Sequence, residues 1–504
     1  MLACLRTAAL FGIDASPVHV EVDVSFGIPS FTMVGLPDAS VRESRDRVKS
    51  AIRNSGFEFP PHRITVNLAP ADVRKAGSAF DLPIALGVLG TQGVVERREI
   101  ADTVVLGELS LDGAIQPARG VLPIAAAARR AGIANVLLPC ANAGEAAIVE
   151  GLRVMPVASL ADAVRALNRP ESAVTARHVA ALVASPAQDA VDLADVRGQL
   201  LARRALEIAC AGNHNLLMVG PPGSGKTMMA RRLPGILPPP TFDEAIEMTA
   251  VHSVAGLLPT GAGLLSSRPF RAPHHTISNV ALIGGGSQPR PGEVSLAHRG
   301  VLFLDEMLEF NRSVLEVLRQ PLEEGFVTIA RAARTVVFPA RFVLVGAMNP
   351  CPCGFFGDPA RECRCTPQQI ERYRGRMSGP LRDRLDLTVD VPAVAPDAIG
   401  SANDNESSSA VRTRVVAARE RQRARFAGLG VATNAEMGPR LMAAHCRLDG
   451  GGARLMSAAI TRLGLSARGY DRVRKVARTI ADLAGAEEIA DTHVAESLQF
   501  RMRT

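Results

Sequence analysis

The chain has 504 residues, of which 47% are hydrophobic, and this length is enough for three or four domains. No uninterrupted apolar run reaches the ~18 residues that a membrane-spanning helix requires, so no such span is expected. Residues 1–15 contain a single positive charge, Arg6, and no convincing cleavage pattern of a signal peptide. We therefore expect a cytoplasmic protein without a membrane partner.

The net charge of +7 is unevenly distributed along the chain. Residues 411–504 contain 17 Lys and Arg against 9 Asp and Glu, a difference of +8, so the rest of the chain is close to neutral. Such an asymmetry is typical of a segment that binds a polyanion, although solvated helix faces also account for much basic charge. Trp is absent and Tyr occurs twice, so extensive stacking of bases on these side chains is not indicated.

The first 167 residues are expected to form one domain. Strand-like and helical patterns alternate in it, which predicts an α/β or α+β fold. The strand-like runs lie at 18–22, 64–68 and 103–106, and the helical patterns at 40–54 and 121–131. The following stretch, 168–190, contains Pro and Ser clusters and is interpreted as a linker.

A glycine-rich stretch follows the apolar run at 216–219, and a helical pattern begins directly after it. The stretch consists of Gly220, Pro221, Pro222, Gly223, Ser224, Gly225, Lys226 and Thr227. Strand, glycine loop and helix in this order are the context of a P-loop, in which backbone N–H groups surround the phosphates of a nucleotide. Lys226 supplies a full positive charge, and Thr227 is placed to ligate Mg²⁺. The sequence therefore predicts that these eight residues bind a nucleotide.

Two further apolar runs end in polar residues that would face this nucleotide, because ligands of α/β sheets lie at the carboxyl ends of the strands. The run at 301–304 ends in Asp305 and Glu306, which are predicted to hold Mg²⁺ and to orient the attacking water, respectively. The run at 342–347 leads to Asn349, which is placed to sense the γ-phosphate. Each of these polar residues could simply end a strand. The P-loop, the Asp305–Glu306 pair and Asn349 in this order nevertheless indicate a catalytic site.

Between the P-loop and Asp305, the segment 268–293 is rich in Gly and Pro and contains His274 and His275. We expect a mobile, functional loop that contacts a partner or the γ-phosphate. A metal site at the two histidines is disfavoured, because adjacent side chains of an extended chain face opposite sides.

A helix is predicted at 312–323, followed by a β-hairpin at 326–338 whose turn is flanked by Arg331 and Arg334. These two arginines form a small cationic tip. A plain surface hairpin needs no function, but its position before the strand that leads to Asn349 would let it reach a central pore.

The eight cysteines fall into two groups. One group is expected to be buried among apolar neighbours, and it consists of Cys4, Cys140, Cys210 and Cys446. The other is a cluster of two Cys-x-Cys pairs, and it consists of Cys351, Cys353, Cys363 and Cys365. Four thiolates at this separation can hold one tetrahedral ion, and zinc is favoured in a reducing compartment. The short spacing within each pair leaves a redox pair or iron–sulfur ligation open.

Arg384 lies in a turn where it could act on the nucleotide of a neighbouring subunit and spread the charge of the transition state; Arg382 is the alternative. A structural salt bridge is the other interpretation of Arg384. Residues 398–410 are interpreted as a flexible linker, and residues 411–504 as a helical, arginine-rich domain. Arg468 opens its most regular helix and has the position of the second sensor arginine of a lid.

The P-loop, Asp305, Glu306, Asn349, Arg384 and Arg468, in that order, resemble an AAA+ ATPase. The runs at 271–275 and 291–300 resemble the magnesium-chelatase subunit I group, so residues 191–397 would form an AAA+ core. The segment 74–83 resembles the proteolytic domain of Lon proteases, which has the ribosomal S5 domain 2-like fold. With the cysteine cluster, the whole chain resembles the YifB/ComM family of magnesium-chelatase-like ATPases.

The resemblance to Lon proteases does not extend to their Ser–Lys dyad. The nucleophile position falls at Ala79, with Ser78 one residue away, and the lysine position falls at Leu122. Leu122 cannot accept the hydroxyl proton, so a non-proteolytic domain is expected at 1–167.

The family resemblance implies ATP and Mg²⁺ as cofactors, a homo-hexameric ring, and a motor that migrates branched DNA during recombination in natural transformation. Arg331 and Arg334 would then contact DNA, and recombination proteins are further candidate partners. A metal-chelation motor and an AAA+ protein remodeller are the alternatives.

Overall fold

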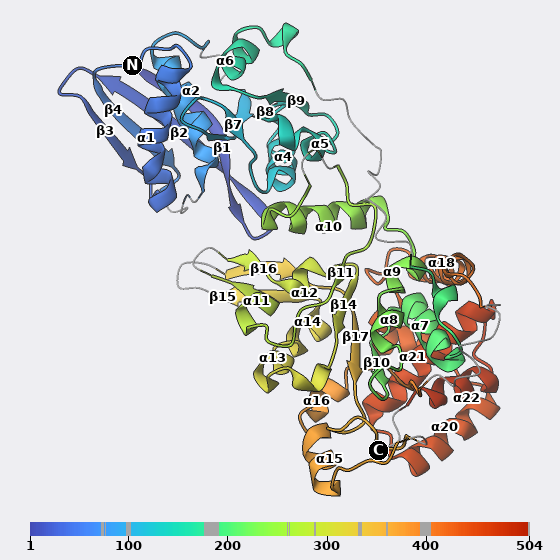
Figure 1. Cartoon of the computed structure of the whole chain (residues 1–504). Coiled ribbons are helices and arrows are strands. Elements are labelled where there is room, and N and C mark those ends of the chain that lie inside the picture. The colour runs from blue at the N-terminus through green and yellow to red at the C-terminus, as the bar shows by residue number, and fades with distance from the viewer. Residues whose placement is uncertain are drawn as a thin grey trace.

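The computed structural model describes residues 1–71, 75, 77–96, 102–175, 191–259, 261, 263–286, 289–330, 335–358, 361–393 and 405–501. Two groups of elements lie on either side of helix α10 (Phe242–Ala255): the N-terminal strands and helices on one side, and a second sheet with the C-terminal helices on the other (Figure 1). None of the helices in these ranges is both long and apolar enough to span a bilayer.

The N-terminal part is built on a seven-stranded sheet with the order β3-β4-β2-β1-β5-β8-β9. Its strands are β1 (Leu2–Phe11), β2 (Asp14–Ser25), β3 (Ser30–Val34), β4 (Arg63–Ala69), β5 (Thr103–Val105), β8 (Asn135–Pro139) and β9 (Arg153–Val157). Neighbouring residues of one strand pack on opposite faces, as the pleat of a strand requires. Val105 belongs to the core beneath α1 (Ala39–Asn54) and α2 (Asp81–Thr91), whereas Val104 belongs to the core beneath α4 (Val121–Arg130). The predicted α/β character of this part is confirmed.

The second sheet is entirely parallel and has the order β11-β14-β17-β10-β18. Its strands are β10 (Leu216–Val219), β11 (Phe270–Arg271), β14 (Val301–Leu304), β17 (Val343–Met348) and β18 (Leu387–Asp390). The three central strands β14, β17 and β10 are buried along their whole length. A parallel sheet covered by helices on both faces needs such continuous apolar runs, which is why the sequence predicts these three strands so closely.

One face of this sheet packs on α7 (Leu200–Gly212), α9 (Leu233–Ile236), α18 (Ser408–Arg425) and α21 (Ala467–Ala484). The other face packs on α11 (Asn279–Ile283), α12 (Glu293–Leu296), α13 (Arg312–Glu316) and the hairpin of β15 (Phe326–Ala330) and β16 (Thr335–Pro339). The C-terminal helices also include α19 (Pro439–His445), α20 (Gly450–Leu463) and α22 (Asp491–Gln499). These helices share a small core of their own, and α18 begins at Ser408, three residues before the predicted start of the helical segment.

Helix α10 joins the two parts of the chain. The Gly120 N–H, just before α4, donates to the Ser253 carbonyl (3.1 Å), and the Ser253 hydroxyl donates to Glu145 (2.7 Å). Leu122 of α4 packs with Ala245 and Met248 of α10. The N-terminal part is therefore fixed to α10 by buried hydrogen bonds as well as by apolar contact.

Two expectations from the sequence are wrong. The segment 268–293 is not a loop throughout, because it contains β11, α11, and the β12 (Gly284–Gly285) and β13 (Arg290–Pro291) pair. Arg271 fixes the segment by pairing with Glu293 at 2.6 Å. The helix predicted at 312–323 is divided into α13 and α14 (Arg319–Glu324), because Pro321 has no N–H to donate to a carbonyl of the preceding turn.

Candidate nucleotide site and cysteine cluster

The predicted P-loop connects the end of β10 to α8 (Lys226–Ala230), in the strand–loop–helix order that the motif requires. Gly223 and Gly225 have φ values of 77° and 92°, in the left-handed region that favours glycine. A Cβ atom at Gly220 would lie 2.1 Å from the Val391 carbonyl oxygen, so any larger residue would displace the neighbouring chain. These three glycines are therefore required by the loop geometry itself.

Lys226 is 8% exposed, and its ammonium lies inside the loop. It donates to the carbonyls of Gly220 (2.7 Å) and Pro221 (2.8 Å), and Asn349 Oδ1 lies 3.4 Å from the same nitrogen. Burial lowers the pKa of Lys226, and the charges of Asp305 and Glu306 oppose this shift. The predicted phosphate-binding lysine and the predicted sensor thus meet at one point.

Asp305 lies next to the P-loop threonine, since Thr227 Oγ1 donates to Asp305 Oδ2 at 2.6 Å. These are the two oxygen ligands expected for a P-loop Mg²⁺. Glu306 follows with φ of 48°, a left-handed conformation that costs a non-glycine residue of the order of 1–3 kcal/mol. Its backbone N–H donates to Asp305 Oδ1 (2.9 Å), and its carboxylate lies 4.0 Å from His275 Nδ1. Strain of this kind is common where a side chain must point at a ligand.

His275 next to Glu306 is a feature that the sequence did not assign. The two residues are separated by the whole of α11, α12 and β14, so no local pattern in the sequence connects them. His274 lies against His275 with ring centroids 4.1 Å apart and the rings tilted by 33°, and it bonds Thr276 Oγ1 at 2.9 Å. The two rings therefore lie on the same side rather than on opposite sides.

Arg384 lies at the end of the strands opposite the P-loop. Asn215 Nδ2 donates to the Arg384 carbonyl at 2.9 Å, and Asn215 precedes β10, whereas the P-loop follows it. Because a strand rises about 3.3 Å per residue, the four residues of β10 separate the two ends by about 13 Å. Arg384 is ion-paired with Glu323 of α14, which is the structural alternative left open by the sequence.

Several arginines gather around Arg384. Burial lowers the pKa of its guanidinium, and the charges of Arg319, Arg468 and Arg472 lower it further. Arg472 lies 3.4 Å from Asp386 Oδ1, and Arg468 is exposed one turn earlier in α21. One chain thus brings together the P-loop, Asp305, Glu306 and Asn349 but places the two predicted trans-acting and sensor arginines elsewhere.

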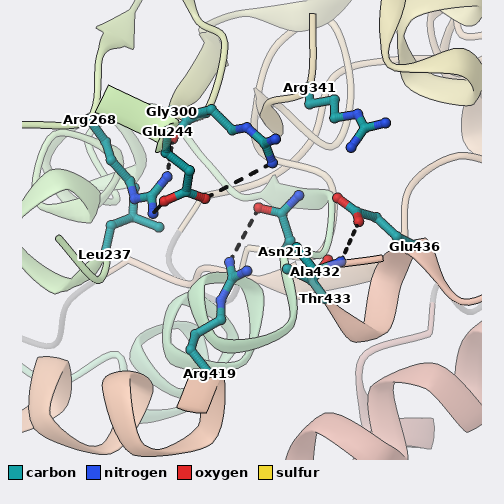
Figure 2. A pocket seen from close by; sticks show the side chains of 11 residues that line it. Asn213, Leu237, Glu244, Arg268, Gly300, Arg341, Arg419, Ala432, Thr433 and Glu436 are labelled. Atoms are coloured by element: carbon teal, nitrogen blue, oxygen red, sulfur yellow. Dashed lines mark hydrogen bonds and ion pairs between the residues drawn. The ribbon is translucent and has the colours of Figure 1, made fainter. Parts of the chain in front are cut away.

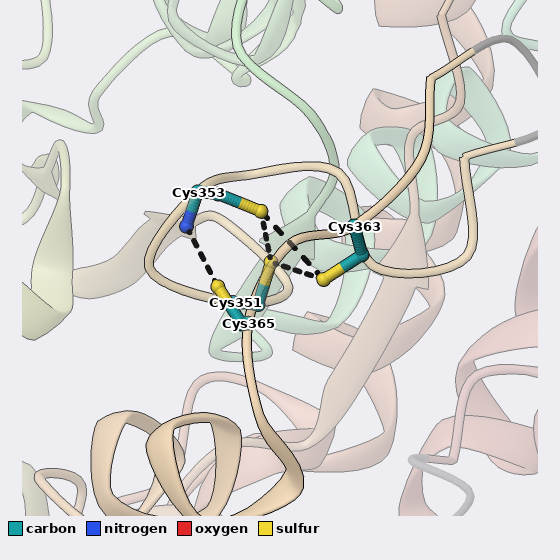
Figure 3. Close-up of side chains that lie close together, drawn as sticks. All are labelled: Cys351, Cys353, Cys363 and Cys365. Carbon is teal, nitrogen blue, oxygen red and sulfur yellow. Dashed lines mark hydrogen bonds between the residues drawn. The ribbon is translucent and has the colours of Figure 1, made fainter.

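The four clustered cysteines converge although they come from two segments (Figure 3). Their sulfur atoms all lie within 4.8 Å of one another, and Cys351 Sγ is 3.3 Å from Cys353 Sγ and 3.7 Å from Cys363 Sγ. A tetrahedral zinc ion with Zn–S bonds of about 2.3 Å would separate its sulfurs by about 3.8 Å. The residues therefore fit a metal ion of this type.

Backbone donors complete the cysteine cluster. The Phe356 N–H donates to Cys351 Sγ (3.3 Å), and the Cys353 N–H donates to Cys365 Sγ (3.4 Å). Hydrogen bonds of this kind stabilise the thiolate form that a metal requires. The expectation for the remaining cysteines holds for Cys210 and Cys446, which are buried.

That expectation is wrong for Cys4 and Cys140, which are exposed. Cys4 lies on β1, where alternate residues face away from the core.

A pocket lined by several arginines is shown in Figure 2. It lies at the N-terminal ends of the strands, whereas the P-loop follows the C-terminal end of β10. Its lining includes Gly300 and Arg341, which precede β14 and β17, together with Arg268. Arg268 is held by Glu244 (2.6 Å) and by the carbonyls of Pro238 and Arg299. The pocket lies where the sheet meets α18, and it is separate from the predicted nucleotide site.

The predicted DNA-contacting residues are only partly described. The hairpin β15–β16 is present with the register Ala330↔Thr335, but Arg331 and Arg334 lie outside the described residues. Many C-terminal arginines bond within the protein, as Arg425 does with Asp482 (2.8 Å) and Arg474 with the Cys446 carbonyl (2.7 Å). The basic excess of this segment is therefore not all available to a polyanion.

Three sequence models of the magnesium-chelatase subunit ChlI match the chain. "Magnesium chelatase, subunit ChlI" covers residues 192–399, "Subunit ChlI of Mg-chelatase" covers 20–142, and "Magnesium chelatase, subunit ChlI C-terminal" covers 405–501. The uncharacterized protein YifB of Salmonella typhimurium is 43% identical over 99% of this chain and 97% of its own length. Competence protein ComM of Haemophilus influenzae is also 43% identical, over the same shares of both chains.

The chain belongs to the YifB/ComM family of magnesium-chelatase-like AAA+ proteins. An uncharacterized protein of Mycobacterium tuberculosis is similar as well, with 45% identity over 98% of this chain and 97% of its own. The parallel sheet that carries the P-loop, Asp305 and Asn349 falls within the first matched region. The family assignment made from the sequence is confirmed.

Proposed function

We propose that this YifB/ComM family protein is an ATP-hydrolysing motor whose catalytic sites form between two chains of a ring. The observation that carries the proposal is the division of the site across β10. The P-loop, Asp305, Glu306 and Asn349 meet at one end of this strand, and Arg384 is bonded at the other end. In a ring, the P-loop end of one chain would face the Arg384 end of the next chain, and the two together would form a complete site.

In this proposal, Lys226 and the P-loop N–H groups bind the β- and γ-phosphates of ATP. Mg²⁺ would be held by Thr227 and Asp305, and it would neutralise charge that develops on the phosphates. Glu306 orients the attacking water, and Asn349 contacts the γ-phosphate. Because Lys226 and Asn349 are already adjacent, ATP would enter by replacing their mutual contact.

Arg384 would stabilise the transition state in the neighbouring chain, and its pair with Glu323 would have to open. Glu323 is half-exposed but Arg384 is only 8% exposed, so opening the pair would also require the Arg384 guanidinium to leave a buried position. Arg468 would serve as the sensor arginine of the helical C-terminal lid at 411–504. A homo-hexamer is the ring size that we propose from the AAA+ membership.

We propose DNA as the substrate on which the motor acts, with branch migration in recombination during natural transformation as its role. Support comes from the similarity over nearly the whole chain to a protein named for competence. Arginines that remain exposed in the C-terminal part, among them Arg454 and Arg462 on α20, would add phosphate contacts to those of Arg331 and Arg334. Recombination proteins would be its partners.

The N-terminal part is proposed to be a Lon-like domain that has lost proteolysis and serves as a scaffold. The position expected for the catalytic lysine, Leu122, is packed against α10. The Ser78 hydroxyl donates to Glu108. A buried leucine in this place removes the base and adds apolar contact with the ATPase part. Zinc is proposed as the metal of the cysteine cluster.

ATP turnover of the full-length protein would test the proposal, measured without DNA and with single strands, duplex and a four-way junction. We expect DNA to raise turnover and Glu306→Gln to abolish the increase. Turnover that responds to no DNA but rises with an unfolded or assembled protein would contradict the DNA proposal and indicate a protein remodeller.

A further inference from the structure

The loop of the cysteine cluster touches the nucleotide site. Cys351 follows the predicted sensor Asn349 by two residues, and Gly354 lies within the turn that carries the first cysteine pair. A Cβ atom at Gly354 would lie 2.5 Å from Pro222 Cδ of the P-loop and 3.9 Å from Asn349 Cγ. The first cysteine turn thus packs directly against the P-loop, and a side chain at Gly354 would also reach Asn349.

The second cysteine pair is linked to the same sensor through the helix that follows it. Cys365 is followed at once by α15 (Pro367–Arg374), which Thr366 caps. From this helix the Tyr373 hydroxyl accepts a hydrogen bond from the Asn349 backbone N–H, and Arg374 Nε donates to the Pro350 carbonyl at 3.2 Å. Two chain segments that would share one metal ion therefore end on Asn349 and its neighbour.

The segment between β17 and α15 contains no helix or strand in its described residues, 349–358 and 361–366. Besides the contacts of the sulfurs, single side-chain contacts hold it, such as that of the Arg374 guanidinium 5.2 Å from the centre of the Phe356 ring. In such loops, binding of a structural metal supplies the free energy of ordering. Without the metal, the contacts of Gly354 with Pro222 would no longer be fixed.

We propose that a zinc-type ion held by Cys351, Cys353, Cys363 and Cys365 clamps the γ-phosphate sensor and the P-loop in place, so that ATP binding depends on the metal. The clamp acts through Gly354 on Pro222 and through α15 on Asn349. This inference rests on the proposed ATP site but not on DNA as a substrate. The four cysteines are positioning residues, since none of them would touch the nucleotide.

The first test uses the full-length protein loaded with zinc. Metal content is measured, zinc is removed with a chelator under reducing conditions, and excess Mg²⁺ is restored after desalting. We expect about one zinc per chain, as four thiolates can hold one ion. Removal should weaken binding of a fluorescent ATP analogue by about tenfold or more, and zinc alone should restore it.

The second test separates metal binding from its effect on the nucleotide. Gly354→Ala keeps all four ligands but places a methyl group against Pro222, whereas Gly357→Ala meets no atom within 4 Å. Both glycines have positive φ, 87° and 79°, so the backbone strain is matched. We expect both variants to keep zinc, and only Gly354→Ala to weaken ATP binding, by about tenfold.

Three outcomes would overturn the inference. The first is a full-length protein that takes up no zinc. The second is ATP affinity that stays within about twofold of the loaded protein when zinc is absent. The third is equal ATP affinity of Gly354→Ala and Gly357→Ala. A zinc-loaded wild type that binds no ATP would instead overturn the proposed function as well, so the two failures are distinguishable.

Discussion

Lys226 and Glu306 differ in how the protein surrounds them. Lys226 is almost fully buried among loop carbonyls, whereas the Glu306 side chain is 60% exposed and faces the space beside Asp305. A buried cation that contacts phosphate is needed for binding, and an exposed carboxylate that orients water is needed for the chemical step. Replacing the two should therefore produce different defects.

We predict that Lys226→Ala abolishes binding of a fluorescent ATP analogue. Glu306→Gln should keep analogue binding and lower ATP turnover by about a hundredfold or more, since it removes only the base. Equilibrium binding and a steady-state turnover assay on the same preparations check both results. Equal loss of binding in the two variants would show that Glu306 has a structural role instead.

Arg384 allows a second test of the proposed site. We predict that Arg384→Ala lowers turnover by about a thousandfold, the range seen for arginines that act on a transferred phosphoryl group. Arg382→Ala should have little effect, and it serves as the neighbouring control. If both variants keep full turnover and Arg384→Ala only lowers the melting temperature, the pair with Glu323 is its whole role.

The packing of helix α21 depends on a buried charge. Asp482 is fully buried and accepts hydrogen bonds from Arg425 (2.8 Å), Arg478 (3.1 Å) and Asn434 (2.8 Å). The cluster joins α18, α21 and the turn at Asn434–Glu436. Removal of the acid would leave the buried Arg478 guanidinium and the partly buried Arg425 guanidinium without this partner.

We predict that Asp482→Ala destabilises the C-terminal helices by about 3–5 kcal/mol, the usual cost of breaking a buried ion pair. Urea unfolding followed by far-UV circular dichroism would show a lower midpoint. Arg165→Ala, which removes an exposed partner of Asp162, should change the stability by less than about 0.5 kcal/mol. An unchanged midpoint for Asp482→Ala would mean that the two arginines find other partners.

Sequence patterns predict the strands around the nucleotide site more closely than they predict the helix that joins the N-terminal part to the rest of the chain. The strands β10, β14 and β17 are short apolar runs followed by loop or polar residues, so both their bounds and their functional ends can be read locally. Helix α10 was not predicted, because it is contacted from two sides and its apolar residues form no single stripe. The pair of Arg384 with Glu323 links residues 61 positions apart and leaves no local signal.

For the whole molecule, the proposed site would require a neighbouring chain, because its parts lie at opposite ends of the sheet strands. A Glu306→Gln chain retains Arg384, and an Arg384→Ala chain retains Glu306. We predict that mixing the two inactive variants under conditions that exchange subunits restores ATP turnover, because some interfaces then combine both intact halves. Co-assembly without any recovered turnover would contradict a site shared between chains.

Separation of a labelled four-way junction would show whether the protein is an ATP-driven motor on DNA. The full-length protein is incubated with the junction and Mg²⁺, with ATP or with a non-hydrolysable analogue, and Glu306→Gln is the matched control. We predict that the wild type with ATP separates the junction into its duplex arms, while the analogue and the variant permit binding only. A wild type that hydrolyses ATP but leaves the junction intact would contradict the claim.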